Sequence, residues 1–141
     1  MATTGVFNGT NLILKVIDDG GTLATQGHTT SATLTLSNDM PEATTKDSSG
    51  FQEVIAGVIS GEISFEGLVA YDDAQGVDEI STSLLGRSKV DWSLSTGVSG
   101  DTIYSGEGFI SSVEVSAEME SPVSYSGTIT CTGTITQGTE V

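Results

Sequence analysis

The chain has 141 residues, with 19 acidic and 4 basic side chains and a net charge of −15. So few cations exclude binding to nucleic acid or to an anionic membrane through phosphate neutralisation, and no apolar run reaches the roughly 18 residues of a membrane-spanning helix. A single cysteine excludes an internal disulfide, and we expect Cys131 to be a small buried residue rather than a reactive thiol. The length fits one domain, 1–141, and the N-terminus MATTGVFNGT lacks the features of a secretory signal, so synthesis in a cytoplasm is expected.

Alternation of apolar and polar residues, the period of a β-strand, dominates the first half of the chain. The first strand is predicted at about 11–17 and is followed by a hairpin turn at 18–21. A second strand alternates around Leu34. A long polar loop follows at about 38–57, and the next strand alternates over Ile63–Tyr71.

The second half of the chain predicts one helix and three further strands. Apolar residues at helical spacing, acidic residues at the start and Gly86 at the end indicate a short helix at about 76–86. Strands resume around Trp92, continue over 102–120, where apolar residues alternate with glutamates, and end over 123–136, where they alternate with Ser and Thr. The fold class is therefore mainly β: an antiparallel β-sandwich or partly closed barrel with one short helix.

Residues that could carry catalysis or bind a metal are few. The single His28 lies in a turn-like segment, where we expect an exposed loop residue rather than a base, and one Cys with one His does not make a zinc site. The segment Asp72–Glu79 groups oxygen ligands but does not follow the EF-hand order, so calcium is a minor alternative. Pairs of carboxylates leave an acidic hydrolase as a distant alternative. We expect no cofactor, no metal and no enzymatic activity.

The two long C-terminal strands have polar faces of Ser, Thr and Glu, and no lysine protects their edges. An unpaired strand edge is a template for pairing with another chain. A ring of identical subunits would pair these edges into a closed barrel, whereas in an isolated domain the same faces are ordinary solvated surface. The edges therefore favour assembly independently of any family.

The segment Pro41–Asp72 carries a family resemblance. TTKDSSGF at 44–51, QEVIAG at 52–57 and the strand EISFEGLVAYD at 62–72 resemble the signature region of the major tail proteins of long-tailed bacteriophages, the subunits of the tail tube. The opening NLILKV at 11–16 and the Ser/Thr/Gly-rich C-terminal strands also fit this family.

The resemblance implies a structural virion protein, made in the host bacterial cytoplasm and located in the phage tail. It implies a homohexamer whose stacked rings form a hollow tube for ejection of double-stranded DNA, which passes through without specific binding. The implied partners are other copies of the chain, a tape-measure protein and the proteins at the ends of the tail. An alternative from another class is a monomeric β-sandwich that acts as a binding, decoration or adhesin module, with an aromatic patch near Trp92 or Tyr104.

Two sets of residues are candidates for the tube's functions. The long loop is expected to reach a neighbouring subunit and to order there, through Pro41, Thr44, Thr45, Lys46, Asp47, Ser48, Gly50, Phe51 and Glu53. The candidates for an acidic lining of the lumen are Glu62, Glu66, Glu114, Glu118 and Glu120. The termini, at about 1–10 and 136–141, are candidates for arms that order on assembly.

Overall fold

A computed structural model describes residues 3–18, 24–25, 28–70 and 76–141. It contains one seven-stranded antiparallel sheet with the strand order β2-β1-β5-β6-β7-β4-β3. The strands are β1 Ile13–Asp18, β2 Ala24–Thr25, β3 Thr29–Asn38, β4 Ile59–Leu68, β5 Lys89–Ser95, β6 Thr102–Ser116 and β7 Ser124–Thr139. The other elements are the helix α1, Val77–Leu85, and the short 3-10 turns η1, Gly9–Asn11, and η2, Lys46–Ser48. The predicted fold, mainly β with one short helix, is confirmed.

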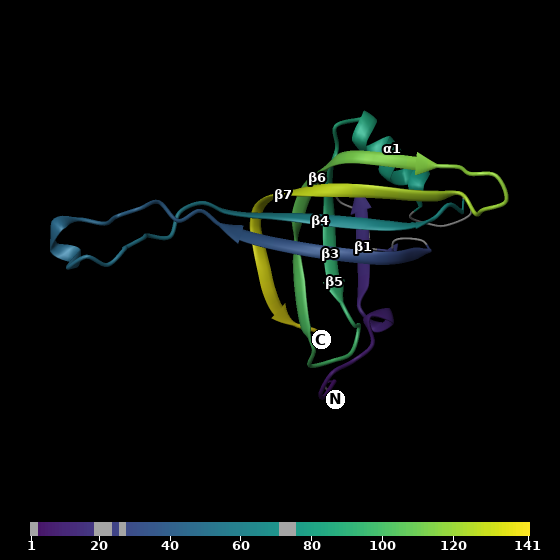
Figure 1. The fold of residues 1–141 in the computed structure, drawn as a ribbon. Helices are drawn as coiled ribbons and strands as arrows, with labels where there is room; N and C mark the ends of the chain where they lie inside the picture. The colour runs from purple at the N-terminus through teal and green to yellow at the C-terminus, as the bar shows by residue number, and fades with distance from the viewer. Residues whose placement is uncertain (1–2, 19–23, 26–27, 71–75) are drawn as a thin grey trace.

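The sheet curls on itself because its two longest strands, β6 and β7, take part in two layers (Figure 1). In one layer β3 and β4 lie beside the first part of β7 and the last part of β6. In the other, β1 and β5 run crosswise beside the first part of β6. The β6–β7 register shifts between Ser105 and Glu107 and between Ile110 and Ser112. Such bulges bend a strand and increase its twist, which allows one strand to serve both layers.

The core lies between the two layers. Ile63 of β4 faces Ile129 of β7, which faces Ile110 of β6, and all three side chains are buried. Trp92 of β5 is 1 % exposed and fills the centre of the second layer. Glycines make room for large neighbours: a Cβ at Gly127 would lie 2.7 Å from the ring of Phe65. The core is thus close-packed, and the buried residues are the apolar ones on the inner face of each alternating strand.

Helix α1 closes the core against β6. Val77 and Ile80 are buried, and the Glu79 carboxylate accepts a hydrogen bond of 2.7 Å from the backbone N–H of Gly76. This bond satisfies one of the free N–H groups at the helix start, as a capping box does. The left-handed residue after the helix is Arg87, with φ 56°, rather than Gly86. The predicted helix at about 76–86 is confirmed to within one residue at each end.

Two predicted boundaries, and the pairing implied by the predicted hairpin, need correction. Strand β6 ends at Ser116, not near 120, because the alternation continues in sequence after the strand has left its partner β7. Strand β7 continues to Thr139 and pairs with the start of β6, so most of the expected C-terminal tail is in the sheet. Strand β1 pairs with the short β2 rather than with the long strand around Leu34. Most of the predicted turn at 18–21, and residues 71–75, lie outside the described part of the chain.

Candidate assembly surfaces

The predicted long loop is a two-stranded arm, Asp39–Val58, that projects well beyond the barrel (Figure 1). Its two legs are joined by backbone hydrogen bonds from Asp39 N to Val58 O, Gly57 N to Asp39 O, Ile55 N to Pro41 O and Ala43 N to Glu53 O, with lengths of 2.6–3.0 Å. The Thr44 hydroxyl adds a further link by accepting from Glu53 N at 2.9 Å. The arm is therefore a ladder continuing from β3 and β4, although its sequence shows no clear alternation.

The tip of the arm is η2 followed by a left-handed turn, with Ser49 at φ 55° and Gly50 at φ 83°. All the predicted assembly residues lie on this arm. Their exposed side chains include Lys46, Asp47 and Phe51, the last 75 % exposed. That they contact a neighbour stays a prediction.

Apolar side chains along the arm are exposed as well. The set, which the sequence reasoning did not select, comprises Met40, Val54, Ile55, Val58 and, at the first position of β4, Ile59, with exposed fractions from 46 % to 71 %. These residues could have been identified in the sequence because apolar residues stand among turn-forming residues within one segment. Exposed apolar patches of this kind mark interaction surfaces.

A mainly polar face covers the outside of the layer formed by β3, β4, β7 and β6, interrupted on β6 by Phe109, which pairs with Thr130 and is 45 % exposed. Strand register places Glu66 between Ser31 and Ser126, and Ser126 next to Glu114. Four residues earlier in β4, Glu62 lies between Thr35 of β3 and Thr130 of β7. Three of the five candidate lumen residues, Glu62, Glu66 and Glu114, are thus on one surface. The face is hollowed by a shallow cavity of about 550 Å³ lined mainly by Ser, Thr and Glu.

The other two candidates, Glu118 and Glu120, lie elsewhere. They belong to the exposed β6–β7 connection, Ala117–Val123, where Glu120 has a φ of 63°. A residue in this conformation does not continue a strand, so the alternation that suggested a shared face with Glu114 does not apply to them.

Both lateral edges of the polar layer are unpaired in the described part of the chain. On one side, β3 pairs only with β4. On the other, β5 pairs with β6 only as far as Phe109, so the last part of β6 has no second strand beside it, although α1 packs against β6. These edges present the backbone groups that a further strand could pair with.

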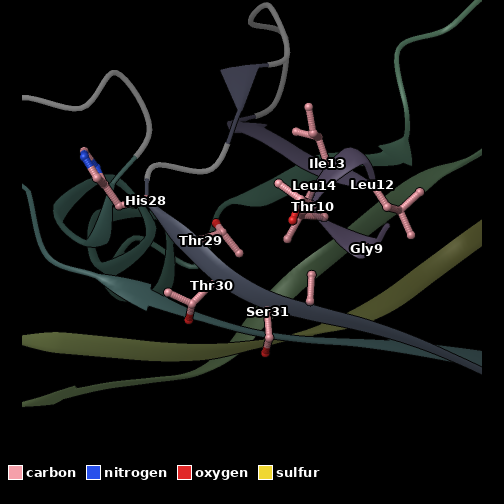
Figure 2. A pocket seen from close by; sticks show the side chains of 10 residues that line it. Gly9, Thr10, Leu12, Ile13, Leu14, His28, Thr29, Thr30 and Ser31 are labelled. Carbon is pink, nitrogen blue, oxygen red and sulfur yellow. The ribbon is translucent and has the colours of Figure 1, made fainter. Parts of the chain in front are cut away.

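Where the curled sheet comes nearest to closing, between β1 and β3, it leaves a cavity of about 460 Å³ (Figure 2). Its walls combine Leu12 and Leu14 with Thr29 and Thr30, and His28 is at its rim with a φ of 49°. His28 is exposed at the start of β3, as expected. The residues of this cavity show no arrangement of nucleophile, base and carboxylate, so it represents the open seam of the barrel.

Sites for other chemistry find little support in the described residues. Among them no group of three or more His, Cys, Asp or Glu side chains could hold a metal ion, and no helix is long and apolar enough to cross a membrane. Trp92 is in the core, donating its Nε1–H to the carbonyl of Glu107 at 3.4 Å, so it cannot form the aromatic surface patch expected of a binding module near Trp92 or Tyr104. Tyr104 is half-buried. Cys131 is half-buried, and burial raises the pKa of its thiol.

The N-terminal segment is fastened to the β5–β6 turn. The Asp101 carboxylate accepts hydrogen bonds of 2.5 Å from the Thr3 hydroxyl, the Thr3 backbone N–H and the Thr96 hydroxyl. The bonds from Thr3 and Thr96 hold the pKa of Asp101 below its usual value. Whether the expected N-terminal arm orders further on assembly stays a prediction.

Comparison with known proteins gives consistent results. A family profile described as phage tail tube protein matches residues 6–137. A tail chain of the empty gene transfer agent particle, resolved with C6 symmetry, has 18% sequence identity and a TM-score of 0.79 over 93% of this chain and 98% of its own. The tail tube of phage SPP1 has 12% identity and a TM-score of 0.79 over 96% of this chain and 81% of its own. A chain of the anti-feeding prophage baseplate has 9% identity and a TM-score of 0.61, covering 97% of each chain. Among curated protein sequences, none matches the chain.

Proposed function

Since the chain belongs to the phage tail tube protein family, and is thus a structural component of the virion tail rather than an enzyme, we propose that six copies form a ring and that rings stack into a hollow conduit for double-stranded DNA. The observation that carries this proposal is the four-stranded polar layer with an open edge on each side. It has the two features that a tube wall requires: edges that can be joined and a face that DNA can pass.

Ring closure follows from the edges. Pairing β3 of one copy with the last part of β6 of the next would satisfy both sets of backbone groups. Repeating the pairing around a closed ring leaves no edge, which is how barrels remove this liability. The tail of the gene transfer agent particle, which contains a chain of the same fold, was resolved with C6 symmetry, and this supports six as the number of copies.

The polar face is the proposed lining of the channel. It combines short Ser and Thr side chains with Glu62, Glu66 and Glu114, and no Lys or Arg lies in the rows of β4 and β7 that carry it. Six copies at −15 carry −90 per ring. At physiological salt, fixed charges act over about 8 Å, so a duplex sliding in the lumen meets repulsion at the wall rather than adhesion. Glu118 and Glu120, at the end of the layer, would lie at a rim between rings.

The arm is proposed to reach a neighbouring copy, and a tape-measure protein is the proposed occupant of the lumen while the tube grows. The proteins at the ends of the tail would meet the first and last rings. These partners are the ones that the resemblance to phage major tail proteins implies.

Electron microscopy of the purified full-length protein tests the assembly. Negative staining should show rings or tubes with a central hole. A protein that remains monomeric at high concentration, without rings, would contradict the proposal.

The orientation of the polar face needs a separate test in assembled tubes, made with Cys131 replaced by Ala. Glu66→Cys should react with a small maleimide and be protected from a maleimide on a large polymer, because the lumen admits only the small reagent. Asp78→Cys, on the exposed side of α1, is the control and should react with both. Equal reaction of Glu66→Cys with both reagents would show that this face is not luminal.

A further inference from the structure

An apolar groove lies between the core face of β3 and the crosswise layer. It contains the seam cavity of about 460 Å³ (Figure 2) and a second cavity of about 440 Å³, and both are lined by Leu12 and Ala32. We call this groove the notch. Its main apolar residues, contributed by β3 and by the crosswise layer, are Leu12, Ala32, Leu34, Leu36, Leu94 and Tyr104.

The notch is a part of the sandwich interior that no described part of the chain covers. Leu34 pairs with the buried Ile63 and therefore lies on the core face of β3, and Leu36, two residues on, shares this face. Leu36 is nevertheless 49 % exposed, and Leu12 on the opposite wall is 37 % exposed. Strand β1 does not pair with β3, so the sheet curls past this region without closing over it.

The ring pairing proposed above determines which element comes to lie beside the notch. Strand β3 is antiparallel to β4, β4 to β7 and β7 to β6. The open edge of β3 and the free edge of β6 therefore run in opposite directions, and two copies can join them in the antiparallel manner of the rest of the sheet. In the joined sheet the polar faces of the two copies are continuous, and so are their core sides.

Helix α1 is on the core side of this joint. It packs against β6, and its Val77 and Ile80 are buried in the same core as Ile110 of β6. Beyond the joint, α1 of one copy is thus the element next to β3 of the neighbouring copy, on the side where the notch is open.

The outer face of α1 carries one large apolar side chain without a cover. Leu85, in the last turn, is 82 % exposed. Asp78 and Thr82, which precede it at helical spacing, share this face and are also exposed. A leucine on an otherwise polar face matches the notch, where leucines lie beside the hydroxyl groups of Thr29 and Thr30 (Figure 2).

A second copy of the chain is therefore the occupant that the notch fits. We propose that α1 of one copy lies in the notch of its neighbour in the same ring, with Leu85 against Leu12 and Ala32. Each subunit then completes the sandwich of the next, and the contact repeats around the ring because the two surfaces are different. The seam is open in the single subunit because its cover belongs to another copy.

The inference rests on the proposed tube and names the side-to-side contact of α1. Cross-linking in full-length protein tests it, in a background with Cys131→Ala. One variant carries Leu85→Cys and the other Ala32→Cys, and the two are mixed, assembled and treated with a short bis-maleimide. Rings and tubes should yield a covalent dimer with one chain of each variant, and the unassembled protein should not. In the control, Ala32→Cys is replaced by Thr35→Cys, on the same strand but on the polar face beside Glu62, which should give no such dimer.

The outcomes of the cross-linking separate the inference from the proposed function. Tubes in which Leu85→Cys links to neither partner variant, or equally to both, would overturn the docking of α1 and leave the tube intact. A protein that forms neither rings nor tubes would overturn both.

The yield of rings is a second measurement. Leu85→Lys should keep a folded subunit, because the side chain is exposed and a cation suits the last turn of a helix. It should reduce the yield of rings by about tenfold or more, since it places an unpaired charge in the notch. Met119→Lys, the same kind of change at a side chain that is 91 % exposed in the β6–β7 connection, should leave the yield of rings unchanged. A native yield of rings from Leu85→Lys would overturn the inference.

Discussion

The barrel and the arm share strands β3 and β4 but differ in what they do with apolar residues. Within the barrel, Ile63 is fully buried and Phe65 is 2 % exposed. A few residues earlier in the chain, Val58 and Ile59 are 71 % and 69 % exposed. The difference arises because a second layer faces the sheet in the barrel and nothing in the described chain faces the arm. Hydrophobic residues in the barrel thus stabilise the subunit, whereas those of the arm are available to stabilise an assembly.

Because the barrel core stabilises the subunit, truncation of its central residue, Trp92, should cause the largest loss of folding free energy. Trp92→Ala should cost about 3–5 kcal/mol, because it removes a large buried side chain and leaves a cavity. Denaturant unfolding of the subunit, followed by circular dichroism, measures the cost. Phe51→Ala, which removes an aromatic ring from the arm, is the control. Equal losses for both variants would remove the distinction between the two regions.

Overpacking should have the next largest effect. Gly127→Ala places a methyl group 2.7 Å from the Phe65 ring, and the displacement that follows should cost about 1–3 kcal/mol. Gly133→Ala is not a suitable control, because Gly133 has a φ of 70°. Gly9→Ala, where no atom lies within 4 Å of the added group, is suitable. Comparable thermal stability of Gly127→Ala and the native chain would contradict the packing described around Phe65.

The N-terminal fastening should respond to pH. Because hydrogen bonds from Thr3 and Thr96 lower the pKa of Asp101 in the folded protein, its contribution to stability is present above about pH 4 and is lost as the pH falls through the lowered pKa. Hydrogen exchange of the N-terminal segment should therefore accelerate, relative to its intrinsic rate, in acid. Asp101→Asn should weaken this pH dependence, and Asp47→Asn, on the exposed arm, should preserve it. An identical acid response in Asp101→Asn would show that another group is responsible.

Changes to the arm should have the smallest effect on the stability of the subunit but should prevent its assembly. The double variant Phe51→Ser, Ile55→Ser should alter the free energy of unfolding by no more than about 0.5 kcal/mol, since both side chains are exposed. Deletion of Thr44–Gly50 should likewise leave a folded subunit. Both should abolish tube growth in electron micrographs. Normal tubes from either variant would contradict the role given to the arm.

Strand positions were predictable from the sequence wherever the two faces of a strand meet different surroundings. Ile63 and Phe65 alternate with Glu62, Ser64 and Glu66 because one face meets the core and the other meets solvent. The helix was predictable because Val77 and Ile80 face the core at helical spacing. The family was predictable from the local motif around TTKDSSGF, and the profile match over residues 6–137 confirms it.

The arm, the β6–β7 connection and the N-terminal fastening could not be predicted from the sequence, because they depend on contacts that leave no regular spacing of apolar residues. The arm pairs through backbone groups, so its ladder leaves no alternation for the sequence to reveal. In the β6–β7 connection, Ala117–Val123, the sequence still alternates although strand β6 has ended. For this reason the alternation wrongly predicted that Glu118 and Glu120 share a face with Glu114. The fastening of Thr3 to Asp101 joins residues 98 positions apart, and no local pattern predicts it.

The length of β6 and β7 has a mechanical consequence. Fifteen and sixteen residues long, these strands carry both the polar layer and the crosswise layer as one covalent backbone. A sideways push on the polar layer is therefore transmitted along peptide bonds into the second layer, and side-chain contacts between the layers need not bear it alone. The two layers should therefore resist shear together and unfold together when the subunit is forced apart.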